Sequence, residues 1–221
     1  MNVEKYLPKS SQEKITTAVS EAEKKVNAEI VPVFMVSSDD YAEAKLRGAI
    51  LTATLFAMGI LIYDHLMGWY QFFLLKNDWL FVASIGIGGI IGYFAFGSIA
   101  ALKKLMIGKE KLKQRSAAMA ERVFGEYKLF ETKGRTGILI FVSLFEHSIE
   151  IVPDKGLKEK ITDDEWHKAI NEMKPSLRAK KFDEAFVQSI SKITEILLTN
   201  KMERAPGSES NELPDHLREN I

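Results

Sequence analysis

Two long apolar stretches without a charged residue constrain the fold of this 221-residue chain more than any other feature. The second, Trp79–Leu102, has 24 residues. As a helix rising about 1.5 Å per residue it would span about 36 Å, enough for a bilayer core. The first, Gly48–Tyr63, has 16 residues. It would span only about 24 Å, but Arg47 at its start can extend its side chain to the interface. Two transmembrane helices are therefore predicted, and a buried helix of a soluble protein is the alternative for each.

The charges around these stretches predict their orientation. Between them, residues 64–78 contain a single Lys or Arg, Lys76, together with the aromatic residues Trp69, Tyr70, Phe72 and Phe73, which favour the headgroup zone. The outer flanks carry Lys45, Arg47, Lys103, Lys104, Lys109, Lys111, Lys113 and Arg115. By the positive-inside rule, both soluble flanks lie in the cytoplasm. We therefore expect a two-span protein of the cell (inner) membrane, with the lipid bilayer as a partner.

The soluble flanks have the patterns of a small α/β domain. The runs EIVPVFMV (29–36) and GILIFVSLF (137–145) are nearly continuous in apolar residues, as strands buried on both faces are. SIEIV (148–152) alternates like a strand with one wet face. Helical spacing of apolar residues predicts helices at about 11–27, 112–130, 162–173 and 181–199. Capping-box patterns at Ser10–Glu13 and Thr162–Glu165 mark two of their starts.

A hairpin of two strands is marginally stable in water, so the strand at 29–36 is needed to complete the sheet. Its long connection to 137–145 predicts a parallel pair, whereas the short turn before 148–152 predicts an antiparallel pair. The expected fold class is α/β: a small central mixed sheet flanked by helices and interrupted by a two-helix transmembrane hairpin. The predicted divisions are the first part of the domain at 1–44, the hairpin at 45–104, the second part at 105–200, and a disordered tail at 201–221.

Composition and motifs restrict the chemistry. Thirty basic and thirty acidic residues cancel, so no nucleic-acid partner is expected. The chain has no cysteine, which removes thiolate nucleophiles and thiolate metal ligands. It also lacks the G-x-S-x-G, P-loop and H-E-x-x-H signatures. Catalytic residues are therefore left unassigned.

Two groups of carboxylates are candidate sites. Asp154, Asp163 and Asp164 follow the last strand and supply oxygen ligands of the kind that calcium or magnesium prefers. The alternative is that Asp163 and Asp164 only stabilise a helix N-terminus. Asp39, Asp40 and Glu146 fall at the opposite edge, at the carboxyl ends of the parallel strands, where open α/β sheets bind ligands. For Glu146, with His147, the alternative is a hairpin turn whose polar side chains lie in solvent.

The sequence TKGRTGILIFVSLFEHSIEIVPDKG (132–156), followed by ITDDEW (161–166), resembles the TPM domain. EIVPVF (29–34) and KFDEAFVQSI (181–190) are similar to it as well, so the resemblance covers about 10–36 and 110–199. That family includes thylakoid photosystem-repair proteins, a nematode acetylcholine-receptor modulator and many bacterial membrane proteins. Some members are described as acid phosphatases or calcium binders, and the resemblance implies those two activities.

Two functions are open at this point. The first is a non-catalytic interaction or assembly and quality-control module at the cytoplasmic membrane face, acting through a protein partner or a homo-oligomer. The second is a divalent-metal-dependent, acid-phosphatase-like enzyme. The folding signals are complete while a catalytic constellation is missing, which favours the first.

Overall fold

The computed structural model describes residues 3–67, 77–132, 134–204 and 215–219. The chain divides into two compact units. The sheet unit comprises Met1–Ser38 and Gln114–Ile221, and the hairpin unit comprises Asp39–Lys113. Residues from before and after the hairpin unit thus fold together. The hairpin unit is wider than the 45–104 expected from the apolar stretches, because it includes charged residues on both sides of them.

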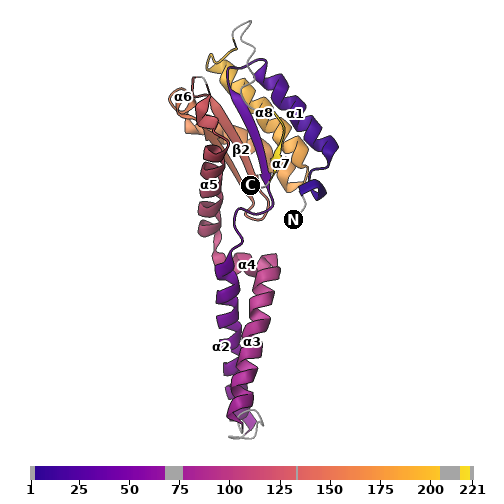
Figure 1. Ribbon diagram of the computed structural model, residues 1–221, viewed down its shortest axis with the longest axis vertical. Coiled ribbons are helices and arrows are strands. Elements are labelled where there is room, and N and C mark those ends of the chain that lie inside the picture. Colours follow the sequence, from indigo (N-terminus) through magenta and orange to yellow (C-terminus); the bar gives the residue numbers. More distant parts are fainter. Residues whose placement is uncertain (1–2, 68–76, 133, 205–214, 220–221) are drawn as a thin grey trace. The chain divides into compact units, whose positions relative to one another are not determined.

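The sheet unit is built on three full strands, β1 (Glu29–Met35), β2 (Gly137–Ser143) and β3 (Ser148–Pro153), and a short fourth strand, β4 (Arg218–Glu219). Their spatial order is β3-β2-β1-β4. β1 and β2 are parallel, and their register runs from Glu29 opposite Gly137 to Met35 opposite Ser143. β2 and β3 are antiparallel. The predicted mixed α/β sheet is therefore confirmed (Figure 1).

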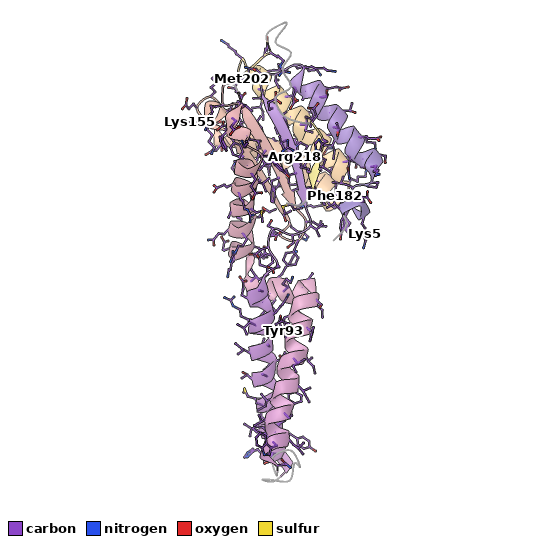
Figure 2. The ribbon with its side chains drawn as sticks, viewed as in Figure 1. Lys5, Tyr93, Lys155, Phe182, Met202 and Arg218 are labelled. Carbon is purple, nitrogen blue, oxygen red and sulfur yellow. The ribbon has the colours of Figure 1, made fainter. Side chains whose placement is uncertain are left out.

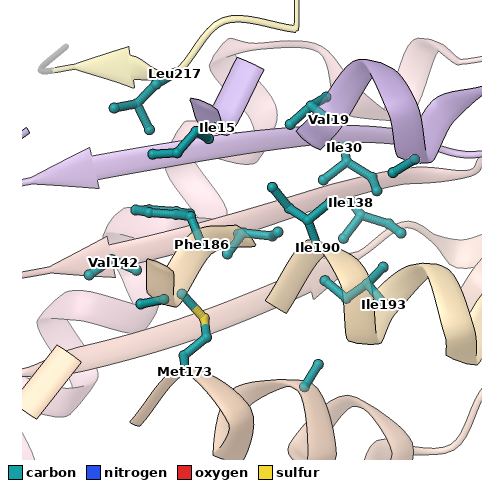
Figure 3. Close-up of a cluster of buried hydrophobic side chains, with 14 of the residues drawn as sticks. Ile15, Val19, Ile30, Ile138, Val142, Met173, Phe186, Ile190, Ile193 and Leu217 are labelled. Atoms are coloured by element: carbon teal, nitrogen blue, oxygen red, sulfur yellow. The ribbon is translucent and has the colours of Figure 1, made fainter. Parts of the chain in front are cut away.

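Helices cover both faces of this sheet (Figure 1). Ile30 and Ile138 point to the face packed by α1 (Lys9–Glu23), α7 (Asp163–Arg178) and α8 (Phe182–Thr199). In Figure 3 they lie with Phe186, Ile190 and Ile193 of α8. Val31 and Leu139 point to the other face, where residues 114–126 of α5 (Lys109–Glu126) contribute Ala120 and Val123. Every residue of β1 and β2 is buried, which explains their continuous apolar runs.

A short fourth strand comes from the segment predicted to be a disordered tail. β4 (Arg218–Glu219) pairs in parallel with Val33 and Phe34 of β1. Leu217 is buried in the core, and Arg218 follows it (Figure 2). The Arg218 guanidinium lies 4.0 Å from the centre of the Tyr127 ring. The prediction of disorder is therefore wrong for 201–204 and 215–219, while 205–214 and 220–221 lie outside the described residues. The reason is the open edge of β1, whose backbone groups gain a partner.

Of the two capping boxes predicted at helix starts, the structure has one. α1 begins at Lys9 after Pro8, so Ser10 lies within the first turn and the capping box predicted there is wrong. The neighbouring Ser11 hydroxyl donates to Asp183 (3.1 Å). The capping box at Thr162 is confirmed. The remaining short helices of the sheet unit are η1 (Val3–Lys5), η2 (Leu129–Glu131) and α6 (Lys155–Lys158).

The hairpin unit contains two helices long and apolar enough to cross a membrane, α2 (Ala42–Met67) and α3 (Asp78–Ser98). Only 11% and 22% of the residues in their most apolar windows are buried, whereas the core helix of a soluble protein is mostly buried.

The second helix, α3, ends four residues before the predicted limit at Leu102, because Ile99 is extended. α4 (Ala100–Ile107) is a separate helix, and Gly108, with φ of 82°, separates it from α5. Lys76 and the aromatic residues 69–73 lie outside the described residues.

α2 and α3 pack against each other closely at some of their glycines. A Cβ at Gly92 would lie 2.6 Å from the Gly48 carbonyl oxygen and would also overlap the Thr52 hydroxyl. A Cβ at Gly48 would meet the Phe96 ring. By contrast, a Cβ at Gly86 of the same α3 would meet no atom within 4 Å. Small residues thus allow the close packing of the pair.

We predict that Gly92→Ala lowers the free energy of unfolding by about 1–3 kcal/mol, as overpacking does, because the Gly48 carbonyl is backbone and cannot turn aside. Gly86→Ala is the matched control and leaves stability unchanged or slightly raised, since alanine favours helix. The measurement is thermal unfolding of the detergent-solubilised chain by circular dichroism. Equal melting temperatures for the two variants would contradict the close approach at Gly92.

Candidate functional site

Glu146 joins the ends of β1 and β2. It lies in the turn after β2, one residue before His147, whose φ of 55° is left-handed. Its Oε1 accepts hydrogen bonds from the Ser38 N–H (2.9 Å) and the Ser37 hydroxyl (3.4 Å), and its Oε2 accepts from the Ser143 hydroxyl. The solvated-turn interpretation is thus right about the turn and wrong about Glu146, which fixes the chain as it leaves β1.

Asp39 and Asp40 open the hairpin unit. Asp39 Oδ1 accepts from the Tyr41 N–H (3.4 Å), and the Asp40 carbonyl accepts from the Lys103 ammonium (3.3 Å). Glu146 belongs to the sheet unit. The grouping of the three acids into one site therefore stays a prediction.

Asp154 lies at the opposite end of the sheet, directly after β3, and is 4% exposed. Its N–H donates to the Gly137 carbonyl (2.8 Å), and its Oδ1 accepts from the Lys155 N–H (2.7 Å) at the start of α6. Its Oδ2 is 2.9 Å from Arg135 Nε. That oxygen has no aligned hydrogen bond within the described ranges, so the guanidinium acts on it through charge. One oxygen of Asp154 is thus directed at its own turn and the other at Arg135 in the turn before β2.

The residues around Asp154 explain the D-x-G sequence. The Gly156 N–H donates to the Arg135 carbonyl (3.1 Å), and Arg135 has a left-handed φ of 58°. A Cβ at Gly156 would lie 2.5 Å from the Gly134 carbonyl oxygen and 2.7 Å from that of Arg135. Only glycine allows so close an approach of two backbones. Arg135 was missed in the sequence, although Gly137 opposite Asp154 would have placed it nearby.

Asp163 and Asp164 lie exposed in the first turn of α7. The Thr162 N–H and hydroxyl each donate to Glu165 Oε2 (3.0 Å), and the Thr162 N–H is the main reason why the pKa of Glu165 lies below its usual value. Over the described ranges, no group of three or more His, Cys, Asp or Glu side chains could hold a metal ion. The structure does not bring Asp154, Asp163 and Asp164 into such a group, and their binding of calcium or magnesium stays a prediction.

An acid that the sequence analysis missed, Glu23 of α1, is 4% exposed. Its Oε1 accepts from the Ile30 N–H of β1 (2.7 Å). The pKa of Glu23 is raised to about 8, chiefly by burial; the nearby charges of Glu29 and Asp215 also raise it, whereas the Ile30 N–H and Arg204 act to lower it. The sequence does indicate that Glu23 is buried, because it lies four residues after Val19 and therefore on the apolar face of the predicted helix.

Arg204 brings the C-terminal segment to this cluster. One guanidinium nitrogen donates to the Glu23 carbonyl (2.8 Å) and the other to Glu29 Oε1 (3.4 Å). Beside them, Val26 and Glu203 form an antiparallel bridge. The cluster therefore holds the residues after α8 against the start of β1, and Glu23 retains its proton near neutral pH.

We predict that Glu23 makes stability depend on pH. Its pKa is raised in the folded state from 4.5 to about 8. Its contribution is therefore complete below about pH 4.5 and is lost as the pH rises toward 8, by at most about 1.4 kcal/mol per pH unit. Glu23→Gln keeps an oxygen acceptor for the Ile30 N–H and does not titrate.

The melting temperature of the wild-type chain should thus fall between about pH 5 and 8 more steeply than that of Glu23→Gln. Glu21→Gln, an exposed change two residues away, is the control and should follow the wild type. Parallel pH profiles for wild type and Glu23→Gln would show that Glu23 does not hold its proton.

Comparison with known proteins is consistent with this fold. Residues 104–196 match the family model of the TPM domain. The NMR structure of the BA42 protein from the psychrophilic bacterium Bizionia argentinensis aligns with a TM-score of 0.60 and 17% identity, over 99% of each chain. At that identity the likeness shows the fold alone. No curated protein matches this chain.

Proposed function

This chain belongs to the TPM domain family, and from that premise we propose a membrane-anchored, non-catalytic module. Its TPM domain works at the cytoplasmic face of the inner membrane, in assembly or quality control, through a protein partner or a second copy of the chain. The hairpin unit is the anchor, and the sheet unit is the part that the partner meets.

The observation that carries the proposal is the exposed apolar surface of α2 and α3. Leu55 is 57% exposed, Ile90 60% and Phe94 64%. Large apolar side chains continue along both helices, among them Ile50, Leu61, Ile62, Val82, Ile87 and Ile91. A soluble protein rarely exposes a continuous apolar surface of this extent, whereas a bilayer covers it.

The sheet supports the orientation. β1 precedes the hairpin unit and β2 follows it, and the two strands pair. The chain must therefore return to the side from which it left, which two spans achieve. The cations beside the spans then favour the cytoplasmic side for both flanks.

The non-catalytic part rests on how the acids are used. Glu146 accepts three hydrogen bonds from the chain around it. Asp154 caps α6 and faces Arg135, and Glu165 caps α7. A general acid or base needs a carboxyl directed at a substrate, and these carboxyls are directed at the fold itself.

The orientation is testable because the chain has no cysteine of its own. We expect Lys24→Cys and Ser191→Cys, both exposed in the sheet unit, to resist a membrane-impermeant maleimide in intact cells and to react after lysis. Lys76→Cys, between the spans, should react in intact cells. Labelling of Lys24→Cys and Ser191→Cys on opposite sides would contradict the two-span anchor.

The enzymatic alternative is tested with a generic phosphomonoester, with and without magnesium or calcium. We expect no turnover by the purified chain and no cation-dependent rise in melting temperature. Asp154→Asn should lower the melting temperature, because it removes the charge that faces Arg135. Cation-dependent turnover that Asp154→Asn abolishes would replace the module with a metal-dependent phosphatase.

A further inference from the structure

α4 is a distinct element at one end of the hairpin. The helix of α3 stops at Ile99, whose φ of −89° and ψ of 109° are extended, and the next helix, α4, runs to Ile107 before Gly108. α4 packs against both α2 and α3, at the end where α2 begins and α3 ends (Figure 1). The chain therefore turns where a continuous membrane helix would have run on.

Specific contacts fix the cations of this region. Arg47 of α2 donates to the Met106 carbonyl (2.9 Å) near the end of α4, and Lys103 of α4 donates to the Asp40 carbonyl (3.3 Å). Carbonyl oxygens carry no net charge, so these two bonds add no negative charge beside the cations. Further along the chain, Lys111 pairs with Glu43 (2.6 Å).

Exposed apolar side chains lie next to these cations. Leu46 is 61% exposed, Ile99 50% and Leu105 71%. Leu46 precedes Arg47, and Leu105 follows Lys104 along the chain. A short helix with cations beside an exposed leucine, as α4 has Lys103 and Lys104 beside Leu105, is typical of the interface. There the leucine enters the acyl boundary and the cations meet headgroups.

We propose that Lys45, Arg47, Lys103 and Lys104, which we call the basic collar, bind the headgroups of anionic phospholipids. The ligand group is a phosphodiester with net negative charge, and the source is the leaflet that surrounds the hairpin. Lys109, Lys111 and Lys113 add positive charge further along the chain. Residues 39–47 and 103–113 of the hairpin unit together contain seven Lys or Arg and four acidic residues, Asp39, Asp40, Glu43 and Glu110. This inference rests on the proposed membrane anchor and adds the class of lipid.

The test uses the full chain in detergent, titrated with phosphatidylglycerol or with phosphatidylcholine, and native mass spectrometry counts the bound lipids. The wild type should bind phosphatidylglycerol about tenfold more tightly than phosphatidylcholine. The double variant Lys103→Gln with Lys104→Gln should lose that preference by about tenfold. Lys103→Arg with Lys104→Arg should keep it, because the charge remains, and Lys24→Gln with Lys25→Gln should keep it, because those lysines lie in the sheet unit.

Equal affinity of the wild type for both lipids, or an unchanged preference in the Lys103→Gln, Lys104→Gln variant, would overturn the basic collar. Excess inorganic phosphate that displaces phosphatidylglycerol would overturn it in favour of a site for free phosphate. Incorporation of the chain into phosphatidylcholine nanodiscs distinguishes a failure of the basic collar from a failure of the proposed membrane anchor. A chain that stays soluble without detergent and does not enter nanodiscs overturns both proposals, whereas one that enters without lipid preference overturns only this one.

Discussion

The parallel pairing of β1 with β2 is the interaction on which the rest of the sheet unit depends. It aligns Glu29 with Gly137 and Met35 with Ser143, and so sets which side chains reach each face. Phe34, for example, points into the larger cluster, where its ring centre lies 5.3 Å from that of Phe182. A slip of one residue would send it to the face of α5 and bring its neighbours to the wrong side. The two buried clusters therefore fix a register that the strands alone would specify weakly.

The same pairing requires the loops at both ends of the sheet to be held in place, and the carboxyl groups of acidic side chains do this. Glu146 fixes the exit of β1 to the turn after β2, Asp154 fixes the exit of β3 to the turn before β2, and Glu23 holds the entry of β1. A buried carboxyl loses favourable hydration and needs partners in return. In this fold Glu146 and Asp154 each lie beside a left-handed residue, His147 and Arg135 respectively, and their hydrogen bonds and ion pair hold those turns.

The sequence was informative wherever burial alone decides structure. The apolar runs of β1 and β2 and the stripes of α7 and α8 predicted the elements, and the connection lengths predicted parallel and antiparallel pairing. The failures depend on distant partners. The two capping-box patterns look alike in the sequence, but α1 begins at Lys9, directly after Pro8, so Ser10 lies inside the helix and does not cap it. β4 has only two residues, both charged, so no periodicity could mark it; the open edge of β1 decides its place. The contacts of Arg135 and Ser38 likewise required the fold.

Strand order in this sheet also dictates an order of events during synthesis. β1 is made before the apolar helices, its neighbour β2 only after them, and β4 later still. During synthesis, β1 therefore has neither neighbouring strand, β2 nor β4, to pair with while α2 and α3 are being made. Such a strand attracts other chains. In the proposed membrane anchor, prompt insertion of α2 and α3 into the bilayer would shorten the time for which the edges of β1 stay unpaired.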